Sequence, residues 1–132
     1  MEALALRLHP NQDLKSALDA FTYERGLEAA CILSCVGSLR RAAIRFADRA
    51  EVSVLDDKFE IVSLTGTLSI HGSHYHIAIA DGQGCTLGGH LMEGCLVYTT
   101  AEIVVGVLPN LSFLREHDNA TGFDELSIHT IT

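Results

Sequence analysis

Short apolar segments rich in small and β-branched residues make up most of this sequence, and only one stretch has the period of a helix. Apolar side chains recur at helical spacing between residues 14 and 21, after a cap at Asn11 or Asp13 and before a stop at Gly26. Strands are predicted at Ala3–Leu8, Ala29–Ser38, Ala42–Ala47, Lys58–Ile70 (as one strand or as two around Gly66), His74–Ala80, Cys95–Val107 and Glu125–Ile131.

The breaks between these segments complete the predicted fold. A turn near Gly37 is expected to separate two of the strands, and Pro109 begins a break in which the stretch through Arg115 forms a turn or a short helix. One early helix followed by many strands predicts an α+β fold, built on an antiparallel β-sheet with one main N-terminal helix. The length of 132 residues corresponds to a single domain over residues 1–132.

The composition is apolar for a small protein, with 48% hydrophobic residues. Some of this apolar surface is therefore expected to be covered by other copies of the chain. No apolar run approaches the roughly 18 residues that cross a bilayer, and the first residues do not resemble a signal peptide. We therefore expect a cytoplasmic protein without a membrane segment, whose cysteines are small buried side chains rather than zinc or redox pairs.

The charge balance argues against direct binding to nucleic acid. The formal net charge is −8, whereas nonspecific binding to a phosphate backbone requires a basic surface. Arginines do gather locally, at positions 40, 41, 45 and 49. On a strand this spacing is more typical of a solvated face, so direct DNA binding is not expected.

Three histidines have the spacing of a metal site. His74 and His76 are separated by one residue on a predicted strand, so they share one face while Tyr75 lies on the other. A Gly-rich reversal through Asp81–Gly84 would bring the next strand alongside and deliver His90. Neutral imidazoles are ligands that zinc prefers, and three of them leave the fourth position for water. We therefore expect the three histidines to bind a divalent metal, with zinc as the expected ion.

Simpler interpretations of these histidines remain open. The rings could be exposed to solvent or buried between subunits, with hydrogen bonds to carbonyl groups. His71 lies near the same hairpin, where it could act as a fourth or substitute ligand, although a histidine in a turn is more often simply exposed.

Glu102 stands between Ala101 and Ile103 in the predicted apolar strand Cys95–Val107. A carboxylate buried there would require a partner. An ion pair with an arginine such as Arg40 or Arg45 is one interpretation. The other is a functional role, in which Glu102 orients a metal-bound imidazole or acts as a general base for bound water.

Several sequence runs, taken in order, resemble one known family. They are Val36–Leu39, Phe59–Gly66, His74–Asp81, Gly88–Leu91, Gly94–Cys95, Thr99–Ile103, Thr121–Gly122 and Glu125–Leu126. Together they resemble the plants-and-prokaryotes-conserved (PPC) domain, also called the PD1-like DNA-binding protein family. The resemblance extends over essentially the whole chain.

The resemblance implies a compact α+β fold and a homotrimer. The resemblance also implies a metal site, because in some prokaryotic relatives a metal is held by histidines that match His74, His76 and His90. The run from Lys58 to Leu64 is similar to the family's partner-contact segment, which makes Lys58, Phe59, Glu60, Ile61 and Val62 candidates for binding a protein partner. DNA binding in plant relatives comes from a separate AT-hook, and this chain has no Arg-Gly-Arg-Pro core.

Two classes of function follow. The first is a trimeric binding module that serves as a regulatory or scaffolding platform. The second is a small zinc-dependent enzyme that uses metal-bound water. The first is preferred, because only the three histidines resemble part of a catalytic set and no nucleophile elbow is present.

Overall fold

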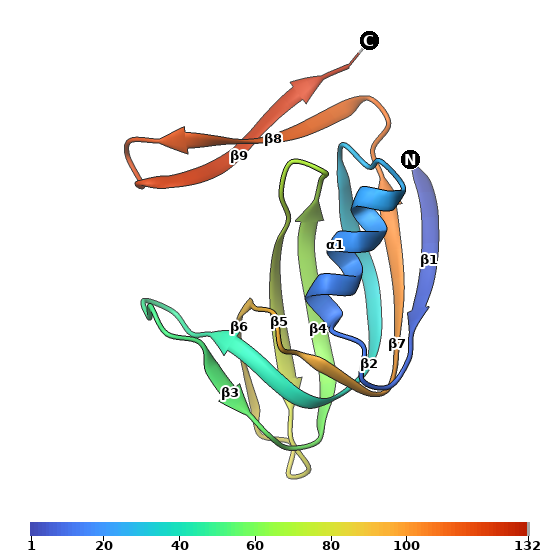
Figure 1. The fold of residues 1–132 in the computed structure, drawn as a ribbon, viewed down its shortest axis with the longest axis vertical. Helices are drawn as coiled ribbons and strands as arrows, with labels where there is room; N and C mark the ends of the chain where they lie inside the picture. Colours follow the sequence, from blue (N-terminus) through green and yellow to red (C-terminus); the bar gives the residue numbers. More distant parts are fainter. Residues whose placement is uncertain (132) are drawn as a thin grey trace.

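The computed structural model describes residues 1–131 as two antiparallel sheets and one helix (Figure 1). The elements are β1 (Glu2–Leu8), α1 (Leu14–Glu24), β2 (Ala30–Arg45), β3 (Ser53–Leu55), β4 (Phe59–Leu68), β5 (His74–Ala80), β6 (Thr86–Leu91), β7 (Leu96–Val107), β8 (Leu111–Asp118) and β9 (Phe123–Thr130). The predicted antiparallel sheet and N-terminal helix are confirmed, but strands dominate more strongly than the α+β class suggests.

The main sheet has the strand order β1-β7-β2-β4-β5-β6, with the short strand β3 paired to β2. The long strand β2 runs between β7 and β4, and its last residues also pair with β6 through Ile44↔Leu91 and Arg45↔His90. Register shifts along the β2–β7 ladder mark bulges, which bend a strand. The bend brings the end of β2 to β6, so strands that are far apart in the sequence enclose one core.

The turn predicted near Gly37 is wrong, because β2 continues through this position. A Cβ atom on Gly37 would lie 2.1 Å from the carbonyl oxygen of Thr100 on β7. The missing side chain therefore permits close approach of two strands rather than a reversal of the chain.

The core lies between helix α1 and the main sheet. The helix buries Leu14, Leu18 and Thr22, and its N-cap is Asp13, whose side chain accepts a hydrogen bond from the Ser16 amide at 3.0 Å. The other carboxylate oxygen of Asp13 accepts from the Gly94 amide at 2.7 Å, which ties the helix start to the segment before β7. The helix predicted from apolar spacing is thus confirmed.

The hairpin of β8 and β9 corrects a second prediction. Residues 111–118 form a strand, whereas a turn or a short helix was expected there. The hairpin lies across one end of the main sheet and extends to one side of it (Figure 1). Ser69 Oγ donates to the Phe113 carbonyl at 2.8 Å, and the Phe113 amide donates to the Glu28 backbone carbonyl at 2.9 Å. These contacts fix the base of the hairpin, while most of β9 is exposed.

Candidate metal centre

Two neighbouring strands carry the three histidines. His74 and His76 lie on β5, and His76 is the direct cross-strand partner of His90 on β6. The intervening Tyr75 is 1% exposed and packs in the core, so the alternation of the strand directs both β5 histidines outward, as the sequence predicts. Strand pairing therefore places three imidazoles on one small area of the outer face.

The glycines before His90 set the spacing of this area. A Cβ atom on Gly88 would lie 2.3 Å from the Ile77 carbonyl oxygen, and one on Gly89 would lie 2.7 Å from the Arg45 carbonyl oxygen. Any larger residue would therefore push β6 away from β5 on one side or from β2 on the other. The two glycines allow β6 to pair with both strands, which fixes His90 beside His76.

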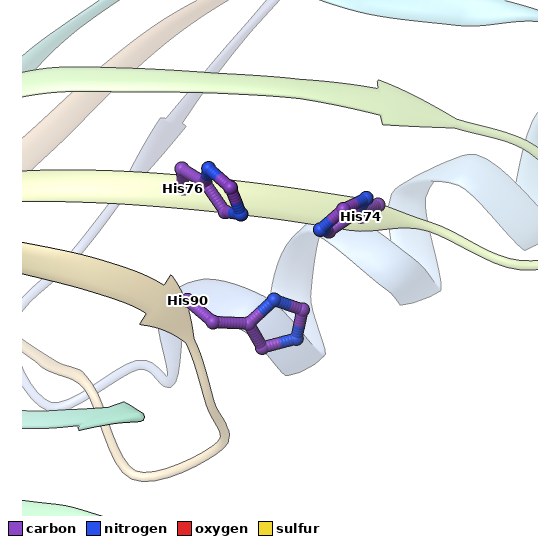
Figure 2. Close-up of side chains that lie close together, drawn as sticks. All are labelled: His74, His76 and His90. Atoms are coloured by element: carbon purple, nitrogen blue, oxygen red, sulfur yellow. The ribbon is translucent and has the colours of Figure 1, made fainter. Parts of the chain in front are cut away.

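The imidazoles converge closely enough to share one ion. A nitrogen from each of the three rings lies within 4.8 Å of the other two. The ring centroids are separated by 4.9 Å for His74 and His76, 5.0 Å for His74 and His90, and 5.8 Å for His76 and His90 (Figure 2). Nitrogens bound to one tetrahedral zinc lie about 3.3 Å apart, so small side-chain rotations complete the geometry. The donor set fits a divalent ion.

The surroundings of His74 and His90 favour the neutral form of these two imidazoles. Partial burial, followed by the neighbouring His76, lowers the pKa of His74 from its ordinary value. Burial and the adjacent imidazoles and cations lower the pKa of His90 to about 4. A metal binds the neutral form of imidazole, so few protons compete with it near neutral pH.

Helix α1 holds the strand that carries His74. Asp19 Oδ1 accepts hydrogen bonds from Ser73 Oγ at 2.5 Å and from Tyr75 Oη at 2.8 Å. These donors are the residues immediately before and after His74. Lys15 Nζ binds the other carboxylate oxygen at 2.7 Å. The helix therefore anchors the start of β5, although no sequence pattern singles out Asp19 for this role.

Two cavities border the histidines. A cavity of about 260 Å³ lies between His74, His76 and the threonines of β4. A second cavity of about 360 Å³ is lined by Arg45, Gly72, Ser73, His74, His90, Arg115, Phe123, Asp124 and Glu125. The hairpin residues of this second cavity were missed in the sequence, because the stretch through Arg115 was expected to form a turn or a short helix rather than a strand that pairs with β9.

Glu102 lies away from this centre. Its side chain is exposed in the single chain, on the opposite face of β7 from the buried Ala101 and Ile103, so it does not enter the core of the domain. Its cross-strand neighbours are Arg7 and Val36. Strands β2 and β4 separate β7 from β5, a distance of about 14 Å at the usual strand spacing. The expected buried carboxylate is therefore wrong, and its position gives Glu102 no contact with the imidazoles.

His71 also lies outside the cluster, and its Nε2 is 3.8 Å from a carboxylate oxygen of Glu28. The cysteines divide in a way that the sequence did not predict: Cys95 is buried, whereas Cys85 is exposed in the turn before β6.

In the predicted partner-contact segment at the start of β4, side chains alternate between the core and the solvent. Phe59 and Ile61 are buried in the core, whereas Glu60 and Val62 are exposed. Lys58 Nζ stands 4.9 Å from the ring centroid of Tyr98 on β7. The outward members, Lys58, Glu60 and Val62, are therefore the ones available to a partner.

The fold and the geometry of the histidines together describe a β-rich domain with a three-histidine cluster, and sequence comparison identifies its class. Residues 1–109 match the Plants and Prokaryotes Conserved (PCC) domain, so the chain belongs to this family, which is the PPC family of the resemblance above.

Individual relatives add detail. The chain is 48% identical over 126 residues to part of the bifunctional protein GlmU of Synechococcus sp. strain JA-3-3Ab, covering 96% of this chain and 20% of that protein. It thus spans about a fifth of the length of the curated relatives that it matches. A solved structure of a hypothetical protein from Salmonella cholerae-suis has 45% identity and a TM-score of 0.96, over 98% of this chain and 94% of the other.

A metal-containing protein from Archaeoglobus fulgidus has 27% identity and a TM-score of 0.79, over 96% of this chain and 94% of the other.

Proposed function

We propose that this protein is a metal-binding PPC-family domain that assembles as a homotrimer and works as a regulatory or scaffolding binding module. The observation that carries the metal proposal is the convergence of His74, His76 and His90 nitrogens within 4.8 Å. The lowered pKa values of His74 and His90 support it, as does the metal-containing relative from Archaeoglobus fulgidus. Zinc is the proposed ion, because it accepts three imidazoles in a tetrahedral site.

A metal analysis tests this function directly. Protein purified without chelator is expected to contain about one divalent ion per chain, and stripped protein is expected to take up zinc with micromolar or tighter affinity. Absence of metal from the purified protein, together with no uptake at micromolar zinc, would contradict the metal-binding function. The proposal of a trimeric binding module does not depend on the metal and would remain.

Exposed apolar side chains support assembly. Val36 is 61% exposed on β2, Val62 is 57% exposed on β4 and Tyr98 is 46% exposed on β7. These three strands are adjacent, so their side chains share the outer face of the sheet. The β8–β9 hairpin adds Ile128, which is 63% exposed, and an isolated two-stranded hairpin is only marginally stable in water. Both surfaces are therefore proposed to pack against neighbouring subunits.

We expect a solution mass of about three times the chain mass of 14.3 kDa. Replacing Val36 by Asp should shift the protein towards smaller species, because a charge would be buried between subunits. Multi-angle light scattering over a range of concentrations measures both results. A wild-type protein that stays monomeric at every concentration would remove the trimer from the proposal.

No appreciable binding to plain duplex DNA is expected at physiological salt. The net charge of −8 repels a phosphate backbone, and few lysines and arginines are present to release counterions. Titration of a fluorescent duplex at several salt concentrations measures this property. Submicromolar binding that weakens steeply as salt increases would contradict the expectation.

The larger of the two cavities favours a second candidate function, a small zinc-dependent enzyme. Three protein ligands leave one coordination position for water, and a cavity of about 360 Å³ beside His74 and His90 offers space for a substrate. Hydrolysis of a panel of ester and phosphoester substrates, lost in His76→Ala, would favour the enzyme over the binding module.

The location proposed from the sequence is the cytoplasm. No helix in residues 1–131 is both long and apolar enough to span a bilayer.

A further inference from the structure

The cavity of about 360 Å³ beside the histidines has cationic side chains on two of its walls. Arg45 enters from the end of β2, where it is the cross-strand partner of His90. Arg115 enters from β8 of the hairpin. Both side chains are partly buried, and both guanidinium groups are close enough to the imidazoles to lower the pKa of His74. The two cations and the metal ligands therefore face one space.

Neither guanidinium is neutralised by an ion pair within residues 1–131, where no carboxylate oxygen lies within 4.0 Å of either. Arg45 Nη1 donates instead to the Arg49 carbonyl at 3.3 Å, and Arg115 Nη2 donates to Thr67 Oγ1 at 3.2 Å. Each hydrogen bond uses one of the five N–H groups of a guanidinium, so both arginines keep donors for a ligand.

The hairpin adds two carboxylates to the same cavity. Asp124 is largely exposed, and its Oδ1 lies 3.7 Å from His117 Nδ1. The carboxylate of Glu125 acts to raise the pKa of His74. Two guanidinium groups and two carboxylates cancel in formal charge. A divalent ion on the histidines would therefore give the cavity a net formal charge of about +2.

We propose that this cavity binds a small organic oxyanion, a carboxylate or a phosphate, between Arg45 and Arg115 with one oxygen directed to the metal. The inference rests on the proposed metal function and specifies the ligand of that site. Oxyanions match the planar donor array of arginine, and an oxygen donor can fill the fourth position of a three-histidine zinc site. The volume of about 360 Å³ suits a small molecule rather than a polymer.

Phe123 sets a further property of the ligand. It lines the cavity at the start of β9 and is 71% exposed, so its ring offers an apolar contact at the outer rim. The structure thus favours an oxyanion with a hydrocarbon portion over a free inorganic ion.

Cobalt-substituted protein provides the test, because the visible absorption of cobalt responds to a change of its ligands. Stripped protein is loaded with one equivalent of Co²⁺, metal content is measured, and inorganic phosphate, acetate and benzoate are titrated separately. Each anion is expected to change the spectrum saturably, with benzoate tighter than acetate. Arg45→Gln and Arg115→Gln should each weaken binding by about tenfold or more while retaining one cobalt per chain.

Arg40→Gln is the matched control, because Arg40 also lies on β2 but its Nε binds Asn11 and it does not line the cavity. Its anion affinity should equal that of the wild type. Failure of the protein to take up cobalt overturns the metal function and this inference with it. Two results would overturn the anion site alone and leave the metal function intact. The first is normal cobalt uptake without an anion response, and the second is an anion affinity in the Arg45→Gln and Arg115→Gln variants equal to that of the wild type.

Discussion

Replacing His76 or His90 by alanine is expected to abolish stoichiometric metal uptake and leave the fold intact. Each substitution removes one of three converging nitrogens, and two imidazoles hold zinc far more weakly than three. Neither side chain belongs to the apolar core, so the metal-free variants should unfold within about 0.5 kcal/mol of the metal-free wild type. Metal analysis and denaturant unfolding measure the two quantities on the same samples.

His71→Ala is the matched control for these variants. His71 lies just before β5, the strand that carries His76, but its ring approaches Glu28 rather than the three-histidine cluster. It should retain one ion per chain. Added zinc should raise the unfolding temperature of the wild type and of His71→Ala but not of His76→Ala, because only an intact site couples binding to folding. Full metal retention in His76→Ala would show that the ion is bound elsewhere.

Gly89→Ala is expected to destabilise the protein by about 1–3 kcal/mol and to weaken metal binding. The new methyl group would lie 2.7 Å from the Arg45 carbonyl oxygen and 2.9 Å from Ile44 Cγ2. The first contact is with backbone, so β6 must move away from β2 to relieve it. His90 is the next residue and would move with the strand. Denaturant unfolding of the metal-free protein and zinc titration measure the two effects.

Gly82→Ala separates this packing effect from the general effect of replacing glycine. A Cβ atom on Gly82 meets no atom within 4 Å, and its backbone does not have a positive φ angle. Its stability should stay the same or rise slightly, because alanine reduces the entropy of the unfolded chain. Equal stability changes in the two variants would mean that the close contact at Gly89 does not constrain β6.

The position of the histidines could be predicted because it depends on neighbouring residues. Tyr75 and Ile77 must enter the core, and strand alternation then leaves His74 and His76 on the outer face. The Gly-rich reversal through Asp81–Gly84 indicated that the next strand lies alongside, whereas the role of Gly88 and Gly89, which allow β6 to lie between β5 and β2, is seen only in the structure. Apolar spacing and Asp13 likewise located the helix, because capping and periodicity are local properties.

Glu102 shows why an apolar segment can mislead. Its neighbours Ala101 and Ile103 are buried, and the same alternation that buries them exposes Glu102. The sequence shows the alternation but does not show whether the second face of a strand is covered. The turn expected near Gly37 failed for a related reason, because glycine serves a tight turn and a close strand contact equally well.

The sequence by itself determined the family, the helix, most strands and the outward direction of the histidines on β5, because these follow from residue order and local periodicity. The tertiary structure decided that β2 bends to meet β6, that residues 111–118 pair as a hairpin strand, and that Arg45 and Arg115 face the histidines across one cavity. The first and third of these features depend on contacts between residues distant in the chain, whereas the hairpin pairs two consecutive segments across one turn. A buried face sets the register of a strand, but the distant segment that covers this face cannot be identified from the sequence of either segment alone.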